Sequence, residues 1–305
     1  MCESCGCGAT EVSLTNLATG RRQILGEHPH THADGTRHSH DHDHDHVHVH
    51  EDATAHSHGH ERGADHAHPP VAVVELNARI LDKNDRIAER NRAWFQGREI
   101  LALNLMSAPG AGKTTLLEKT LAALTERQVF VLEGDQATDR DGARMQAAGA
   151  TAVQINTGRG CHLDAEMVAR GLAELKPTPQ SLLFIENVGN LVCPALFDLG
   201  EAKRVAILSV TEGDDKPIKY PHMFRAADLM LLNKTDLLRY VDFDPERAIA
   251  HARAVNPAIE VLQLSARTGN GMAAWHDWIS HAQKESRTAW FTTIASSNAP
   301  ADQAG

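Results

Sequence analysis

The chain has 305 residues, enough for one large domain or two smaller ones, and its formal net charge is −10 with histidine neutral. This acidic balance and the lack of a Lys/Arg cluster exclude a protein that binds nucleic acid. The longest apolar run, ILALNLM, is far shorter than a membrane span, and the amino terminus lacks the pattern of a signal peptide. We therefore expect a cytoplasmic protein that is not bound to a membrane.

Residues 1–27 form a short head that begins MCESCGCGAT. Its Cys2, Cys5 and Cys7 supply three soft ligands within six residues. Removal of Met1 would free an α-amine that chelates an ion together with the Cys2 thiolate, a set that suits square-planar Ni(II) or Cu(II). The chain has five cysteines, an odd number, and no export signal, so a disulfide framework is not expected.

Residues 28–70 form a histidine tract, which holds 15 of the 20 histidines and hardly any aliphatic residue. Such a composition cannot bury a core, so we expect disorder. Its imidazoles bind divalent ions weakly and without selectivity, which favours metal storage, with a solubilising linker as the alternative. As a flexible tether of roughly 65 residues between head and folded domain, the tract would give the head a reach of about 45 Å.

Residues 71–97 carry Ile80, Ile87 and Trp94 at seven-residue spacing, which predicts one amphipathic helix packed on a folded domain. Residues 98–285 then alternate strand and helix. The strands lack period-2 alternation, which predicts helices on both faces of a mainly parallel sheet, a doubly wound α/β fold. We expect strands near 100–107, 129–134, 151–156, 182–188, 205–210, 229–233 and 260–265, helices near 113–126, 139–148, 164–175, 245–255 and 271–284, and a disordered tail at 286–305.

A phosphate-binding loop is predicted where SAPGAGKTT joins an apolar strand to an amphipathic helix. Gly110 and Gly112 let backbone amides close around phosphates. Lys113 neutralises the β and γ oxygens, and Thr114 can ligate magnesium. Ser107 stands where the usual pattern has its first glycine.

Two carboxylates at strand ends are candidates for sensing the γ-phosphate. Asp135, in EGDQATDRDG, is placed to hold magnesium or the attacking water. Glu186 and Gly189, in FIENVGN, resemble the DxxG switch of G proteins with Glu in place of Asp, so we expect Glu186 to reach magnesium through water. No Gln is placed in an obvious position to orient an attacking water, which predicts slow, switch-like hydrolysis.

A second metal site is predicted from Cys161 and His162, which are adjacent, and Cys193, four residues beyond Gly189. Two thiolates and one imidazole suit zinc or nickel. Because Cys193 stands on the switch segment, a movement of that segment would change the metal geometry. The alternatives are a structural Cys–His pair and a cysteine that only packs, and the ligand types do not distinguish nickel from zinc or copper.

The base site is predicted from LLNKTDLL, which places Asn233, Lys234 and Asp236 at a strand end about 120 residues after the phosphate-binding loop. A carboxylate at Asp236 can accept hydrogen bonds from the guanine N1 and N2 donors, whereas adenine offers it no matching pair. Ser265 and Ala266, in the following SAR, extend this pattern. The sequence therefore predicts GTP and GDP as ligands.

Together these motifs resemble the HypB family, the nickel-incorporation GTPases of [NiFe]-hydrogenase maturation. The resemblance rests on MCxxCGC, SAPGAGKTT, EGDQATDRDGARM, NTGRGCHLDAEMV, FIENVGNLVCPALFDLGE, SVTEGDDKPIKYPHMF and LLNKTDLL, and it covers the head and nearly all of residues 73–280. It implies a SIMIBI-class GTPase domain that forms a homodimer when GTP is bound. Carried over by motif, the residues for nucleotide and Mg²⁺ are Gly110, Ala111, Gly112, Lys113, Thr114, Thr115, Asp135, Glu186, Asn233 and Asp236.

The resemblance also implies that the protein delivers nickel to the hydrogenase large subunit, with a small zinc-containing accessory protein and a nickel chaperone as partners. Cys2, Cys5 and Cys7 would be tight Ni²⁺ ligands, and the Cys161, His162 and Cys193 set a weaker site for Ni²⁺ or Zn²⁺. The histidine tract would store nickel. The alternatives are a nickel storage protein whose GTPase domain only regulates assembly, and a maturation GTPase for urease or a cobalamin enzyme.

Overall fold

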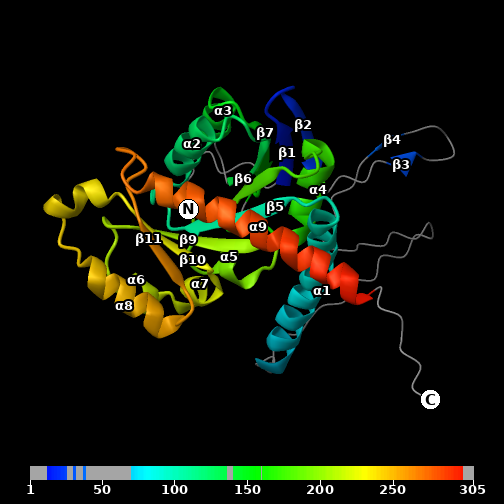
Figure 1. Cartoon of the computed structure of the whole chain (residues 1–305). Coiled ribbons are helices and arrows are strands. Elements are labelled where there is room, and N and C mark those ends of the chain that lie inside the picture. Colours follow the sequence, from blue (N-terminus) through cyan, green and yellow to red (C-terminus); the bar gives the residue numbers. More distant parts are fainter. Residues whose placement is uncertain are drawn as a thin grey trace, which may run out of the picture.

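A nine-stranded sheet forms the centre of the part of the chain that the computed structural model describes, residues 12–25, 30–31, 37–38, 70–135, 140–158 and 160–297 (Figure 1). Seven neighbouring strands of this sheet are parallel, and a hairpin adds two strands beyond them at one edge, the first of which runs antiparallel to its neighbour. A separate pair joins β3 (His30–Thr31) to β4 (Arg37–His38). In spatial order the large sheet contains β11 (Glu260–Gln263), β10 (Leu229–Asn233), β9 (Lys203–Ser209), β5 (Leu101–Ser107), β8 (Leu182–Glu186), β6 (Val129–Asp135), β7 (Thr151–Asn156), β1 (Val12–Asn16) and β2 (Arg21–Leu25).

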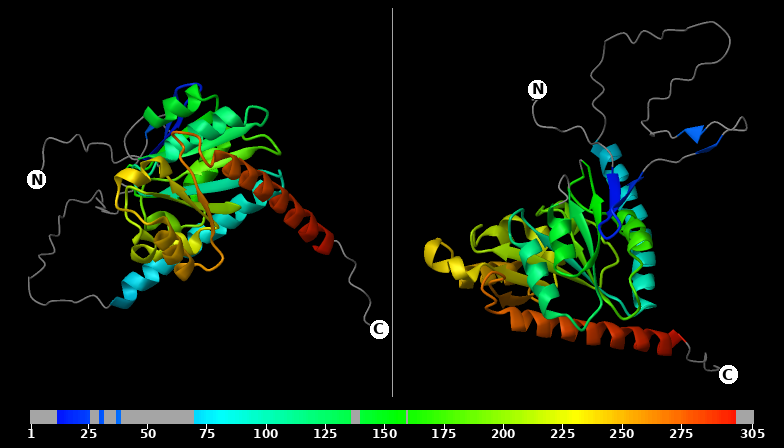
Figure 2. Two further views of the ribbon diagram at one scale, coloured as in Figure 1. Left: turned by 60° about the vertical axis from the view of Figure 1, so that its left-hand side comes forward. Right: turned by 90° about the horizontal axis from the view of Figure 1, so that it is seen from above.

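Helices cover both faces of this sheet (Figures 1 and 2). One face carries α2 (Lys113–Ala123), α3 (Arg140–Ala147) and α9 (Met272–Ser297), and the other carries α1 (Pro70–Gln96), α4 (Ala165–Leu175), α5 (Cys193–Leu196), α7 (Pro221–Ala226) and α8 (Pro245–Val255). The short α6 (Lys216–Lys219) precedes α7, and a 3₁₀ helix, η1 (Thr235–Tyr240), follows β10. The expected doubly wound, mainly parallel α/β fold is confirmed.

The strands are apolar throughout because alternate residues enter two different cores. In β5, Leu103 and Leu105 face the core beneath α2 and α9, where Trp275 is fully buried. Ala102 faces the opposite core with Phe95 of α1. A strand buried on both faces needs no polar face, which explains the absence of period-2 alternation in the sequence.

The hairpin of β1 and β2 differs from the expectation for the head. Residues 13–16 pair antiparallel with β7, and residues 21–25 pair back onto residues 12–16. Leu14 is 3% exposed and belongs to the core that contains Val153 and Ile155. The chain therefore joins the folded domain at Val12, so the expected tether of roughly 65 residues between head and domain is wrong.

The two ends of the described domain agree with the sequence to different degrees. The first helix, α1, begins and ends within one residue of the expected range of 71–97. The last helix, α9, continues to Ser297, where we expected a disordered tail from residue 286. Near the start of this extension, Arg287 forms an ion pair with Glu99, the residue that follows α1 by three positions. None of the described helices has the length and apolar character needed to cross a membrane.

Candidate nucleotide and metal site

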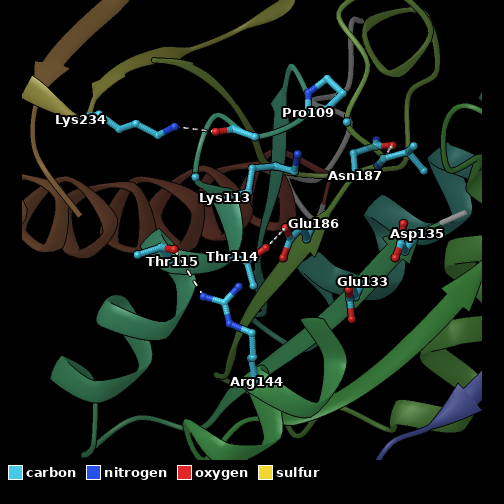
Figure 3. Close-up of a pocket in the computed structure, with 15 residues that line it drawn as sticks. Pro109, Lys113, Thr114, Thr115, Glu133, Asp135, Arg144, Glu186, Asn187 and Lys234 are labelled. Carbon is cyan, nitrogen blue, oxygen red and sulfur yellow. Dashed lines mark hydrogen bonds between the residues drawn. The ribbon is translucent and has the colours of Figure 1, made fainter. Parts of the chain in front are cut away.

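The carboxyl ends of the parallel strands meet at one edge of the sheet, where a cavity of about 510 Å³ opens (Figure 3). In a doubly wound sheet this edge is the usual place for a ligand. We call this space the nucleotide cavity. Its lining residues are Pro109, Gly110, Gly112, Lys113, Thr114, Thr115, Glu133, Gly134, Asp135, Arg144, Glu186, Asn187, Val188, Gly189 and Lys234.

The predicted phosphate-binding loop connects β5 to the first turn of α2. Gly110 and Gly112 have φ values of 74° and 101°, a region that favours glycine. A Cβ on Gly112 would also lie 2.7 Å from Nδ2 of Asn233, so the loop can approach the base site only with glycine here. Lys113 Nζ donates to Ser107 Oγ at 2.8 Å, across the loop. The first amides of α2 point out of the helix toward the loop, and the helix dipole adds positive potential there, so this loop suits an anion.

Oxygen ligands gather on the opposite side of the nucleotide cavity. Thr114 Oγ1 donates to Glu186 Oε1 at 3.1 Å, which brings together two of the predicted magnesium residues. Asp135 lines the same cavity from the end of β6, and so does Glu133, two residues earlier (Figure 3). Carboxylate and hydroxyl oxygens are what Mg²⁺ prefers, so this set fits the ion.

Glu133 is a residue that the sequence analysis missed. Its side chain lies opposite Glu186 in the register of β6 and β8, and it is 2% exposed. The signal was present, because residues 133 and 135 stand two apart on a strand and therefore share a face. Asn187 and Arg144 also line the cavity without having been predicted.

A second cavity of about 290 Å³ adjoins the first and contains the predicted base residues. Asn233 holds the two loops together, since its Nδ2 donates to the Ala111 carbonyl at 3.0 Å and its Oδ1 accepts from the Ala266 amide at 3.1 Å. Lys234 Nζ donates to the Gly110 carbonyl at 2.7 Å. The cavity is lined by Gly112, Thr115, Asn233, Lys234, Asp236, Leu237, Ala266 and Arg267.

Asp236 is positioned for base recognition by its neighbour on the next loop. Ser265 Oγ donates to Asp236 Oδ1 at 2.6 Å, and Arg267 lies 4.0 Å from Oδ2. These contacts leave Asp236 at the lining of the second cavity with one carboxylate oxygen free of the serine. Ser265 itself is fully buried, so it fixes the carboxylate rather than contacting a ligand.

Cys161, His162 and Cys193 form a cluster, which we call the Cys–His–Cys cluster. One ligand atom from each lies within 4.8 Å of the other two, and all three side chains are half-buried. Sγ of Cys161 lies 3.7 Å from Nδ1 of His162, and the His162 ring stacks on Phe197 with centroids 3.9 Å apart. Residues 31 positions apart in the sequence thus meet in a geometry that suits one soft or borderline metal ion.

The local electrostatics favour the neutral forms of His162 and Cys193. A hydrogen bond with Cys161, together with burial, raises the pKa of Cys193 to about 11. Burial lowers the pKa of His162 below its ordinary value, against the opposing charge of Asp164. The imidazole is therefore neutral and ready to coordinate at neutral pH, whereas the Cys193 thiol must release a proton when a metal binds.

Two hydrogen bonds connect the nucleotide cavity to the segment that carries Cys161 and His162. The Leu163 amide donates to Asn187 Oδ1 at 3.0 Å, so the residue after His162 is bound to the residue after Glu186. The Thr157 amide donates to the Asp135 carbonyl at 2.9 Å. Gly189 lies against the phosphate-binding loop, where an added Cβ would be 3.0 Å from Pro109 Cα. A structural change at one of these sites therefore has to cross only a few residues to reach the other.

Helix α1 fixes both segments of the cluster from behind. Asn84 Oδ1 accepts from the Ala165 amide at 2.9 Å, and its Nδ2 donates to the Asp198 carbonyl at 2.8 Å. Asn91 Nδ2 donates to the carbonyls of Ala165 and Leu199. The segment after His162 and the segment after Cys193 are thus held by the same helix.

The predicted head ligands Cys2, Cys5 and Cys7 lie outside the described residues, as does nearly all of the histidine tract. Within the described residues, the Cys–His–Cys cluster is the group of three or more side chains placed to hold a metal ion. The structure brings together Lys113, Thr114, Asp135 and Glu186 in one cavity and the base residues in its neighbour.

Comparison with known proteins gives one consistent family. Residues 101–263 match the family described as "CobW/HypB/UreG, nucleotide-binding domain". The protein "Hydrogenase maturation factor HypB" of Azotobacter chroococcum mcd 1 is 59% identical over 223 residues, which cover 72% of this chain and 73% of that protein. The protein of the same name from Escherichia coli (strain K12) is 46% identical over 284 residues, 92% of this chain and 98% of that protein.

Solved structures agree with these relatives. The "Crystal structure of HypB from Helicobacter pylori in complex with nickel" has 36% identity and a TM-score of 0.64, and the match covers 67% of this chain and 96% of that one. The "Crystal structure of Hydrogenase Maturation Factor HypB From Archaeoglobus Fulgidus" has 40% identity and a TM-score of 0.63, over 67% of this chain and 100% of that one.

Proposed function

The chain belongs to the HypB family of hydrogenase maturation factors, within the CobW/HypB/UreG nucleotide-binding proteins, and on this basis we propose that it hydrolyses GTP while it stores nickel and inserts it into a [NiFe]-hydrogenase. The segment from Glu186 to Cys193 supports this function most directly. It starts in the nucleotide cavity and ends in the Cys–His–Cys cluster, so one short segment belongs to both sites.

The nucleotide roles follow from the two cavities. Asp236 accepts from the guanine N1 and N2 donors, held by Ser265, while Asn233 and Lys234 brace the phosphate-binding loop. The backbone of residues 110–115 surrounds the phosphates, and Lys113 turns from Ser107 to the β and γ oxygens. Thr114 and Asp135 would hold magnesium, with Glu186 acting through water, and the ion would offset the phosphate charge during hydrolysis.

Nickel is the cargo of the Cys–His–Cys cluster. Cys161 and Cys193 would bind it as thiolates and His162 through a ring nitrogen, with the fourth position open to water or to another chain. Zn²⁺ would use the same ligands, because the donor set suits both ions. Since the cluster is half-buried rather than enclosed, an ion can enter it and leave it, as delivery requires.

The coupling between the two sites would run through residues 186–193. When the γ-phosphate is present, contacts at Glu186 and Gly189 differ from those with GDP, and the displacement reaches Cys193 along the chain and Leu163 through Asn187. Nickel affinity then depends on the bound nucleotide, and hydrolysis gives transfer a direction. By linkage, nickel changes the nucleotide affinity by the same factor.

This coupling is tested by measuring nickel affinity with GDP and with a non-hydrolysable GTP analogue. Replacing Cys2, Cys5 and Cys7 by serine in the full chain removes nickel binding by the head. Adding Cys161→Ser to that chain removes the cluster as well, so the nickel binding that remains is the background to subtract. We expect affinities that differ at least fivefold, the lower end of typical coupling energies. Equal affinities with both nucleotides would remove the coupling.

Assembly and partners extend this proposal. GTP-dependent formation of a homodimer would present two clusters to the maturation machinery, which would include an accessory protein, a nickel chaperone and the hydrogenase large subunit. A storage protein is the second candidate, and the 15 histidines of the tract favour it. Loss of the tract would abolish the cellular function of a storage protein, whereas loss of Lys113 or Cys2 would abolish that of a delivery protein.

A further inference from the structure

The hairpin of β1 and β2 enters the domain at the edge of the sheet that carries the nucleotide cavity. Because β1 is antiparallel to β7, its first residues lie beside the last residues of β7, and Ser13 is opposite Asn156. The parallel strands all end at this edge. Leu25 is paired with Val12, so β2 also ends there. The head and the histidine tract therefore both leave the domain from this edge.

Side-chain contacts, as well as the backbone hydrogen bonds to β7, attach the hairpin to the domain. Leu14 is buried in the core beneath α4, and Asn16 Nδ2 donates to Glu174 Oε1 of α4 at 3.0 Å. The turn is closed by the Gly20 amide, which donates to the Asn16 carbonyl at 2.8 Å, with Gly20 at a φ of 69°. Contacts to both β7 and α4 give the hairpin a fixed position on the domain.

The loop that carries Cys161 and His162 begins at the same edge of the sheet. Directly after Asn156, Thr157 and Gly160 form a tight turn, in which the Gly160 amide donates to the Thr157 carbonyl at 2.8 Å. Thr157 Oγ1 donates to the Gly160 carbonyl at 2.7 Å. Cys161 follows at once, so the strand that pairs with β1 leads in five residues to the Cys–His–Cys cluster.

Chain lengths show that the head reaches this cluster. The path from Val12 to Cys161 runs one residue along β1, across the ladder to Asn156, one residue to Thr157, across the turn to Gly160, and one residue to Cys161. Consecutive Cα atoms lie about 3.8 Å apart, paired residues about 5 Å apart and the ends of a tight turn within about 7 Å, so this path is at most about 24 Å long. An extended chain spans about 3.5 Å per residue, so Cys7 can move about 17 Å and Cys2 about 35 Å from Val12. Cys2 is thus within range of the cluster in its own chain, even if the path has its full length of about 24 Å.

We propose that the β1–β2 hairpin anchors the head beside the Cys–His–Cys cluster, so that nickel passes between the two sets of thiolates within one chain. The step is ligand exchange: each incoming thiol releases its proton as its sulfur binds nickel, each outgoing thiolate takes one up, and no electron is transferred. This inference rests on the proposed function, since it needs nickel at both sites. The anchor itself can be tested without metal.

The first experiment measures crosslinking in the metal-free full chain with Cys5, Cys7 and Cys193 replaced by serine. A short bis-maleimide should join Cys2 to Cys161 within one chain. Inserting a 20-residue Gly/Ser segment between Thr10 and Glu11 lengthens the tether from about 10 to about 30 residues, which should slow crosslinking roughly fivefold by the fall in effective concentration. The same segment inserted after Glu27 is the matched control and should have no effect.

A second variant, Leu14→Asp, places a carboxylate in the core and should release the hairpin, slowing crosslinking on the order of tenfold. The circular dichroism spectrum and nucleotide binding of this variant report whether the remaining domain is folded. If crosslinking is as fast with the insertion as without it, the anchor is overturned, whatever Leu14→Asp does.

The second experiment follows nickel itself, at half an equivalent per full-length chain. We expect a slow phase, seen in the thiolate-to-nickel charge-transfer band, that is absent in Cys161→Ser, independent of protein concentration and insensitive to a chelator added after mixing. The insertion before Glu11 should slow it roughly fivefold. A slow phase that grows with protein concentration, or that appears only when head-deficient and cluster-deficient chains are mixed, would overturn transfer within one chain.

The two proposals fail in different ways. If either thiolate set binds no nickel in titrations of Cys2→Ser and Cys161→Ser chains, the delivery function fails, while crosslinking still decides the anchor. If both sets bind nickel but the insertion changes neither crosslinking nor the slow phase, the anchor fails and the delivery function stands.

Discussion

Asp236 is held in place before a base binds, because Ser265 donates to one of its carboxylate oxygens and Asn233 ties the neighbouring loops together. A carboxylate fixed in this way recognises two donors at low entropic cost. On the proposed function, selectivity for guanine would depend on the chemistry of one side chain and on the rigidity of its support. The two contributions can be separated by substitution.

Asp236→Asn keeps one acceptor but points an amide N–H group at a guanine donor. Losing a charged hydrogen bond and leaving a donor unmatched costs about 3 kcal/mol, so GTP affinity should fall about 100-fold. Xanthine nucleotides, which carry a carbonyl in place of the 2-amino group, should gain in relative affinity. Ser265→Ala should weaken all guanine nucleotides less and leave the base preference intact. Titration with fluorescent GTP, GDP, XTP and ATP analogues measures this, and an unchanged GTP affinity in Asp236→Asn would contradict the role of Asp236.

At the scale of elements, α1 supports the Cys–His–Cys cluster although it supplies none of the ligands. Asn84 contacts the segment after His162 and the segment after Cys193, and Gly200 allows the helix to lie close, since an added Cβ there would be 2.5 Å from the Ala88 carbonyl. The geometry of the cluster thus depends on an element that the sequence presents only as an amphipathic helix.

Asn84→Ala should lower both stability and nickel affinity. The Ala165 amide loses its acceptor in a buried place, which costs about 1–3 kcal/mol of unfolding free energy. Because the two ligand segments are then less firmly held, nickel affinity at the cluster should fall several-fold. Thr120→Ala, which removes the acceptor of the Trp275 indole on the other face, is the matched control for stability alone. Equal nickel affinities in the two variants, measured in a chain without head cysteines, would show that α1 does not position the cluster.

The parallel strands were predictable from the sequence to within about two residues, because a strand buried on both faces reads as an apolar run. The Cys–His–Cys cluster was predictable because Cys193 follows the switch motif so closely. The β1–β2 hairpin was not, since Leu14 is one buried residue among polar neighbours at a sheet edge. Asn84 was missed for a related reason: on an amphipathic helix a polar side chain reads as solvent-exposed until its buried partners are known.

At the scale of the whole molecule, one edge of the sheet brings together the nucleotide cavity, the Cys–His–Cys cluster and the two ends of the hairpin. These elements therefore face the same side of the domain. The helices α1 and α9 cover opposite faces of the sheet (Figure 2), and α1 contacts both segments of the cluster through Asn84. On the proposed function, a partner that receives nickel from the cluster would approach this edge.

The storage and delivery functions separate when the 15 histidines between His28 and His68 are replaced by serine, a change that keeps the chain length and leaves the hairpin and α1 intact. We expect the purified chain to lose its weakly bound nickel, measured by equilibrium dialysis, while the tight site and GTP hydrolysis stay unchanged, because weak imidazole sites contribute capacity rather than affinity. In cells, hydrogenase activity should fall only when nickel is scarce. Lys113→Ala and Cys2→Ala should instead abolish the activity at every nickel concentration, since they remove the phosphate contact and a tight ligand. Loss of hydrogenase activity in the histidine variant with ample nickel would make storage the primary function.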